Sequence, residues 1–161
     1  MTHRFLRLAI EMVMAGRSST DGAAVWRQVG AAFALELVKL LYEKARILPN
    51  SYHGGLFIGR DCHTIDDNSA VLCDVLVGKV LDVHLAPYKQ AWRLWNSVRK
   101  TLNRVCTIPA QEAFQFRADT AAMVILLKGS FPRISISPKL QILIFHAPDV
   151  LDAFGSIRLY G

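Results

Sequence analysis

The amino-acid sequence predicts an α+β fold in which a mostly antiparallel sheet packs against two long helices. Two long stretches place apolar residues at intervals of three and four, which is the period of an amphipathic helix. Several short apolar runs with β-branched residues lie between turn residues, and they do not alternate regularly with helices, so a doubly wound parallel sheet fits less well. The length of 161 residues matches one domain, 1–161, and a hydrophobic content of 52% with 20% charged residues excludes a disordered chain.

The first segment, residues 4–14, has two interpretations. Apolar residues at alternate positions from Leu6 onward are typical of a strand, whereas Arg7 and Glu11 are spaced as on one face of a helix. The abundance of Leu, Ala, Met and Glu favours a helix on propensity. The sequence alone therefore leaves strand and helix open for this segment.

A turn and a long helix are expected next. Ser18 stands three residues before Asp21, which resembles a capping box at a helix N-terminus. The helix is expected over residues 22–48, ending before Pro49. Its wide apolar arc predicts a mostly buried helix that lies across a sheet.

Short apolar runs after Pro49 are the expected strands. The run 71–83 contains β-branched residues in partial alternation, and Gly78 is the expected position of a bulge. Three later runs predict an antiparallel meander with prolines at its edges, and a last run predicts an edge strand. These later runs are residues 123–127, 133–137, 141–145 and 156–160.

A basic amphipathic helix is predicted over residues 87–105. Its five cations occur without any acid, so this segment supplies +5 of the formal net charge of +6. Such a helix suits an anionic partner, either a membrane surface or a nucleic-acid backbone, although an ordinary surface helix also shows a solvated charged face. The absence of acids favours the binding interpretation, because neighbouring like charges destabilise a helix. The candidate binding residues are Lys89, Arg93, Arg99, Lys100 and Arg104, with Trp92 and Trp95 on the apolar face.

The sequence contains no recognisable catalytic or metal-binding motif, so no enzyme, cofactor, catalytic residue or metal ligand is predicted. The His, Cys and Asp residues between Tyr52 and Asp67 lack the paired spacing of a structural zinc site, which favours an ordinary polar loop.

The three cysteines are expected to be buried thiols in a reducing compartment. No signal peptide and no apolar stretch of about 20 residues is apparent, so membrane contact is expected to be peripheral.

Taken in order, these elements resemble the globular core of rhabdovirus matrix proteins, which link the viral nucleocapsid to the inner face of the envelope. The features that carry the resemblance extend along most of the chain. They are a strand at 4–14, a long helix from Gly22, the Ile-Gly step at 58–59, an apolar strand ending at Gly78, the basic Trp-containing helix with its sequence RKTL at 99–102, and the Lys-Gly turn and strands at 123–137. The resemblance favours a strand for residues 4–14.

The resemblance implies a non-enzymatic viral matrix-type protein of the virion that supports budding. It implies self-association into a homo-oligomer, peripheral contact with an anionic membrane, and binding to the viral nucleocapsid or RNA, with host factors as further partners. The implied locations are the inner face of the envelope, the host cytoplasm and the host nucleus. The Lys- and Pro-rich arm and the Pro-Pro-x-Tyr motif of animal members are missing, which implies a divergent member or another way to recruit budding factors.

Two alternatives remain for the function. An RNA-binding protein would use the same helix, with its cations on phosphates and its exposed aromatic residues on bases. An enzyme of ADP-ribosyltransferase-like fold is suggested by the runs GLFIG at 55–59 and VLCDVLVGK at 71–79, which faintly resemble the paired central strands of that family. The histidine motif and the catalytic glutamate of that family have no convincing counterparts here.

Overall fold

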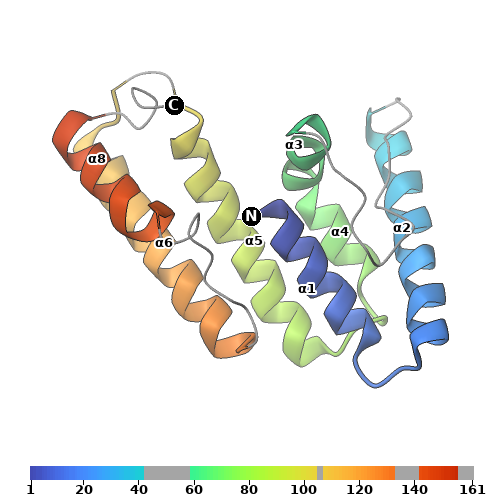
Figure 1. Cartoon of the computed structure of the whole chain (residues 1–161). Coiled ribbons are helices and arrows are strands. Elements are labelled where there is room, and N and C mark those ends of the chain that lie inside the picture. The colour runs from blue at the N-terminus through green and yellow to red at the C-terminus, as the bar shows by residue number, and fades with distance from the viewer. Residues whose placement is uncertain (42–58, 105–106, 133–141, 156–161) are drawn as a thin grey trace. The chain divides into compact units, whose positions relative to one another are not determined.

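The computed structural model describes residues 1–41, 59–104, 107–132 and 142–155, and within these ranges every regular element is a helix (Figure 1). The predicted α+β fold with an antiparallel sheet is therefore wrong. The chain divides into two compact units, Met1–Lys89 and Gln90–Gly161, with the boundary inside helix α5. The elements are α1 (Thr2–Met14), α2 (Ser19–Leu41), α3 (Gly59–Asp67), α4 (Ser69–Val75), α5 (Asp82–Leu102), α6 (Ala110–Ser130), the π-helical turn η1 (Ile142–His146) and α8 (Ala147–Phe154).

Helix α1 corrects the expectation of a strand at residues 4–14. Phe5, Ala9 and Val13 are fully buried, and their spacing of four residues is the period of a helix. The alternation from Leu6 onward arises because the buried arc of α1 is wide enough to include neighbouring positions as well. On the exposed side, Arg7 Nε lies 3.1 Å from Glu11 Oε1, one helical turn away.

The predicted cap at Ser18 is confirmed. The backbone N–H of Asp21 donates to Ser18 Oγ at 3.1 Å, and Ser18 Oγ donates to the Asp21 carboxylate at 2.6 Å. Helix α2 begins just after Ser18, slightly before the predicted start, and residues 42–48 of the predicted helix lie outside the described residues. Gly22 permits a close approach between α1 and α2, because a Cβ at this position would lie 2.1 Å from Met14 Sδ.

The first unit is a helical cluster around one apolar core. Helix α1 packs against α2 and α3, and α2 packs against α4 (Figure 1). The side chains of Phe33, Leu37 and Leu72 are among the most buried. Tyr88 joins this core from the beginning of α5: its hydroxyl donates to the carbonyl oxygen of Phe5 at 2.9 Å, and the two rings meet edge to face. The core of this unit therefore depends on helix packing alone in the described chain.

Residues 71–83 were predicted as a strand and instead form parts of two helices and a turn. Leu72 is buried on α4, and Leu76 and Val80 are buried in the turn between α4 and α5. Gly78 has a φ of +70° and lies in the turn after α4, where a left-handed conformation favours glycine, so it is not a bulge. The β-branched content of this run suggested a strand, but this preference depends on the surroundings of a segment more than on its composition.

The expected meander is also wrong where the structure describes it. Residues 123–127 lie inside α6, and Met123 and Leu127 are buried at a spacing of four. Residues 142–145 of the next run belong to η1. Residues 133–137 and 156–160 lie outside the described residues.

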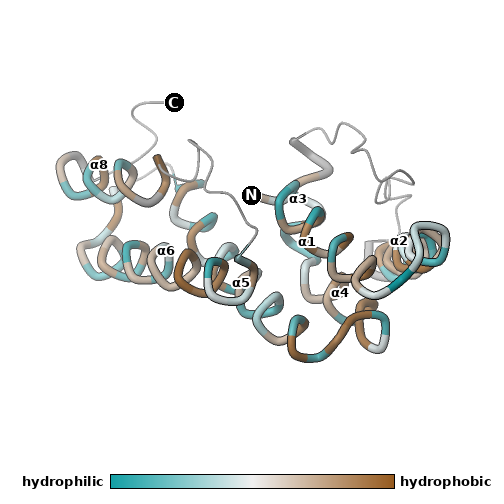
Figure 2. Tube along the Cα trace, turned by 60° about the horizontal axis from the view of Figure 1, so that its bottom comes forward, coloured by the Kyte–Doolittle hydropathy of each residue, from teal (hydrophilic) through white to brown (hydrophobic). Residues whose placement is uncertain are grey.

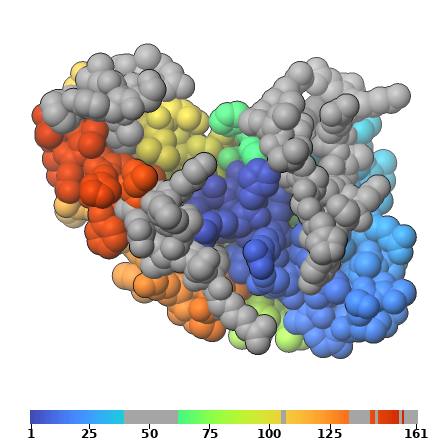
Figure 3. Space-filling model, in the orientation of Figure 1, coloured from blue at the N-terminus to red at the C-terminus, as the bar shows by residue number. Residues whose placement is uncertain are grey.

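In the second unit, α6 packs against η1 and α8. Apolar residues occur on successive turns of α6 (Figure 2), and Phe116 and Leu127 are buried on it together with Leu151 of α8. The space-filling view shows α8 (red) over part of α6, whose C-terminal part (orange) remains visible (Figure 3). The N–H of Ile108 donates to the carbonyl oxygen of Gly155 at 2.7 Å, which ties the segment before α6 to the end of α8.

None of the helices found in the described ranges is long and apolar enough to span a membrane.

Candidate functional site

Helix α5 is the predicted basic helix. It begins at Asp82, five residues before the predicted start, and includes Pro87 in its second turn. It ends at Leu102, so Arg104 follows the helix, and Val105 lies outside the described part of the chain. The prediction of a helix in this region is confirmed, and its cations can now be placed one by one.

Two of the predicted cations are held by carboxylates within their own unit. Lys89 Nζ lies 3.2 Å from Asp74 Oδ1 in the first unit. Arg104 Nη1 lies 2.7 Å from Glu112 Oε2 at the beginning of α6. Arg99 is half-buried. These three residues are therefore less available to an external anion than the sequence suggests.

Arg93 and Lys100 are the available cations of α5. Both are exposed, and neither forms an ion pair or a side-chain hydrogen bond with any residue that the structure describes. They are seven residues apart, which is close to two helical turns, so they point to nearly the same side and are about 10 Å apart along the helix axis. This pair is the part of the predicted site that faces solvent.

The two indoles of α5 are not displayed together. Trp92 is only 2% exposed, so its ring cannot insert into a bilayer or stack on a base in this conformation. Trp95 is half-buried, and its Nε1 finds no hydrogen-bond acceptor in the described ranges. The α5 side of the site is therefore defined by charge rather than by exposed aromatic surface.

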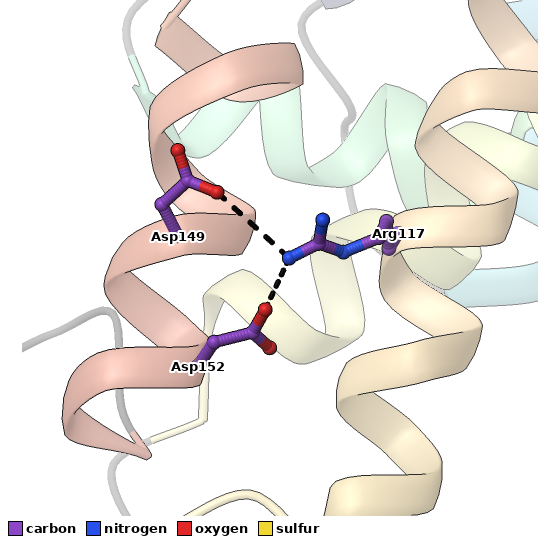
Figure 4. Close-up of polar contacts among 3 residues, drawn as sticks. All are labelled: Arg117, Asp149 and Asp152. Carbon is purple, nitrogen blue, oxygen red and sulfur yellow. Dashed lines mark hydrogen bonds and ion pairs between the residues drawn. The ribbon is translucent and has the colours of Figure 1, made fainter.

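The charge excess of the chain belongs to the second unit. Gln90–Gly161 contains nine Lys and Arg residues against four Asp and Glu residues, whereas Met1–Lys89 contains ten against nine. Each of the four acids of the second unit has a partner within it, but only Glu112 is matched one to one by a cation. Glu112 pairs with Arg104, Asp119 accepts hydrogen bonds from Ser97 and Gln115, and Asp149 and Asp152 both face Arg117 (Figure 4).

An apolar surface on α6 was missed by the sequence reasoning. Phe114 is 73% exposed and Ile125 is 72% exposed, and both point away from the buried side of α6. The available signal was that apolar residues occur on all sides of residues 110–130 when they are read as one helix. Assigning 123–127 to a strand divided this stretch and hid the pattern.

The polar stretch before Asp67 does not form the expected loop where it is described, because residues 59–67 form α3. Cys62 Sγ lies 3.7 Å from His3 Nε2, and the buried Asp66 accepts a hydrogen bond from Thr2 Oγ1 at 2.7 Å. Among the described residues, no three His, Cys, Asp or Glu side chains are arranged to hold a metal ion. Tyr52 and His53 lie outside the described residues.

Comparison of the chain with protein-family models, curated proteins and solved structures gives no match. The resemblance to rhabdovirus matrix proteins is neither supported nor refuted by these comparisons, so it stays a prediction. Its expected strands at 4–14 and 123–127 are helical in this chain, and its expected strand at 71–78 consists of the end of α4 and a turn.

Proposed function

We propose that this protein is a non-enzymatic structural protein that attaches peripherally to an anionic membrane surface through its second unit. The observation that carries the proposal is the pair Arg93 and Lys100, exposed on one side of α5 in the unit that holds the charge excess of the chain. Each Lys or Arg close to an anionic bilayer contributes about 1 kcal/mol of binding free energy. A few such contacts give attachment that is reversible and sensitive to salt.

A lipid surface fits the site better than RNA. Proteins that bind single strands combine a basic groove with exposed aromatic side chains on which bases stack. Trp92 is buried and Trp95 is half-buried, so α5 offers no such stacking surface. The exposed large apolar residues described in the second unit are Phe114 and Ile125 on α6 and Ile142 and Phe145 on η1, and such residues in a unit with excess cations suit the interface of a bilayer.

The matrix-type role extends this proposal. In that role the same protein also self-associates and binds a ribonucleoprotein, at the inner face of a viral envelope. The support for this part is the basic Trp-containing helix, because the strands expected from the resemblance at 4–14 and 123–127 are helical in this chain. The alternative of an ADP-ribosyltransferase-like enzyme loses its support in residues 71–79, which form α4 and a turn instead of a central strand.

Co-sedimentation with vesicles tests the proposal. The full chain is mixed with vesicles of phosphatidylcholine alone, and with vesicles that also contain phosphatidylserine, at low and high salt. We expect binding only to the anionic vesicles and weaker binding at high salt. A parallel titration with single-stranded and structured RNA separates the two partner classes. Steeply salt-dependent binding to RNA without affinity for anionic vesicles would overturn the membrane proposal and favour RNA binding.

A further inference from the structure

Helix α6 has an apolar stripe on the side opposite its buried face. The stripe consists of Phe114, Ala118, Ala121 and Ile125, all exposed. Their spacings of four, three and four residues place them along one side of a helix for about three turns. The buried side consists of Phe116, Thr120, Met123 and Leu127. Helix α6 is therefore apolar on both sides, and only one side is used by the core.

The stripe differs from scattered exposed apolar residues, which are common on protein surfaces. Its two bulky side chains are at its ends, and both are more than two-thirds exposed. The two alanines between them keep the surface apolar without hiding the helix backbone. The result is a continuous ridge that suits an apolar layer more than water.

Hydrogen bonds and an ion pair place the free cations beside this stripe. Ser97 of α5 donates to Asp119 of α6 at 2.5 Å, and Arg104 pairs with Glu112, so α5 runs alongside α6. Arg93 and Lys100 stand four residues before and three residues after Ser97, and these positions share one face of a helix. Both helices turn their buried residues inward, so these cations and the stripe lie on the outer side of the helix pair.

The other charges around the stripe are also defined. Lys128, exposed and without a side-chain partner among the described residues, stands three residues after Ile125 on the same side of α6. Arg117 lies on the same flank as Lys128, eleven residues or about three turns earlier, and it faces Asp149 and Asp152 (Figure 4). Asp119, whose hydrogen-bond donors Ser97 and Gln115 are neutral, lies toward α5. The stripe therefore has free cations on both flanks: Arg93 and Lys100 stand on the α5 side, and Lys128 offsets the single excess negative charge of the α8 side.

We propose that the apolar stripe of α6 inserts into an anionic bilayer at the level of the headgroups and the first acyl carbons. Arg93, Lys100 and Lys128 then contact the lipid phosphates. This inference rests on the proposed membrane function and names the residues that enter the lipid. Apolar residues combined with flanking cations are the general requirement for such interfacial attachment.

A second copy of the chain fits the stripe less well. Two bulky residues and two alanines on one helix bury far less than the roughly 1,200 Å² of a stable protein interface. Stacking two such surfaces would also bring their free cations together, and like charges across an interface oppose association. The anionic lipid surface satisfies both the apolar stripe and the cations.

The test compares a stripe variant, Phe114→Ser with Ile125→Ser, with a matched control, Leu35→Ser with Val77→Ser. The control residues are exposed bulky apolar residues of the first unit. Binding to vesicles with phosphatidylserine is measured at low and high salt. Salt screens the cations but not the apolar insertion, so the wild type and the control are expected to retain part of their binding at high salt. The stripe variant is expected to bind at least tenfold more weakly at low salt and to dissociate completely at high salt.

Three further outcomes are informative. Equal binding of the stripe variant and the wild type at both salt concentrations would overturn insertion while leaving the membrane proposal intact. No binding of the wild type to any anionic vesicle would instead overturn the membrane proposal itself. A wild type that is dimeric without lipid, with a monomeric stripe variant, would assign the stripe to self-association and contradict insertion. Circular dichroism checks that the variants keep their helices, and a conservative Phe114→Leu variant is expected to keep salt-resistant binding.

Discussion

The two units of the chain are built alike but carry different surfaces. Both consist of helices with fully buried aromatic residues, such as Phe33 in the first and Phe116 in the second. In the first unit, ten cations stand against nine acids, whereas in the second unit nine cations stand against four acids. Unbalanced surface charge contributes little to folding and costs some stability through repulsion. The fold therefore does not account for the excess of the second unit, which our proposal attributes to an anionic partner.

The exposed apolar residues show the same contrast. In the first unit they are distributed over α2, the turn after α4 and the beginning of α5: Leu35, Val38, Val77, Leu81 and Val83. In the second unit, Phe114 and Ile125 are aligned on one side of α6, and Ile142 and Phe145 are exposed on η1. Among the described residues, the aligned pair on α6 lies in the unit that holds the charge excess, and the following variants test whether binding belongs to that unit.

The largest effects are expected in the cores. Phe33→Ala and Phe116→Ala should each destabilise the protein by about 3–5 kcal/mol, because both side chains are almost fully buried and leave cavities. Thermal unfolding followed by circular dichroism measures this. Vesicle binding should fall with the folded fraction for Phe116→Ala. A Phe33→Ala protein that keeps its helix content but loses vesicle binding would break the assignment of binding to the second unit.

The next effect concerns the paired cations. Glu112→Gln releases Arg104 and should tighten binding to anionic vesicles about fivefold, which corresponds to about 1 kcal/mol for one added lipid contact. The matched change in the first unit, Asp74→Asn, releases Lys89 and should tighten binding much less. Equal tightening by the two variants would place Lys89 in the binding surface, as the sequence first suggested. Because both ion pairs are exposed, each variant should change stability by no more than about 1 kcal/mol.

The smallest effect is confined to the first unit. Tyr88→Phe removes the hydrogen bond to the Phe5 carbonyl and should cost about 1–2 kcal/mol of unfolding free energy, because the carbonyl is left buried without this donor. Vesicle binding should be unchanged. Denaturant unfolding gives the free energy, and a weaker affinity for vesicles in this variant would show that the two units are coupled.

The fold could be predicted only where the signal was local. The cap at Ser18 and the basic helix were found because a capping motif and an uninterrupted helical period identify these elements within a few residues. The strands failed because a short apolar run does not distinguish a buried helix from a strand. At 71–83 the β-branched residues suggested one strand, whereas the run is divided among α4, a turn at Gly78 and the beginning of α5. At 4–14 the resemblance to matrix proteins favoured the wrong interpretation.

The sequence identified the cations of the candidate site, but not which of them are free to bind a partner. Counting charges found all five cations of residues 87–105. Their partners, Asp74 for Lys89 and Glu112 for Arg104, are distant in sequence and are brought close by the packing of other helices. The apolar stripe required Phe114 and Ile125 to be placed on one continuous helix, which the assignment of a strand at 123–127 prevented.

The most direct test of the account is the affinity of two charge variants for vesicles that contain phosphatidylserine. Arg93→Gln with Lys100→Gln removes the two exposed cations of α5, and Arg27→Gln with Lys79→Gln removes two cations without side-chain ion pairs in the described part of the first unit. Both variants lose the same net charge. The account predicts a loss of about 30-fold for the α5 variant, from about 1 kcal/mol per cation, and a much smaller loss for the control. Equal losses would contradict a membrane-binding site on the second unit.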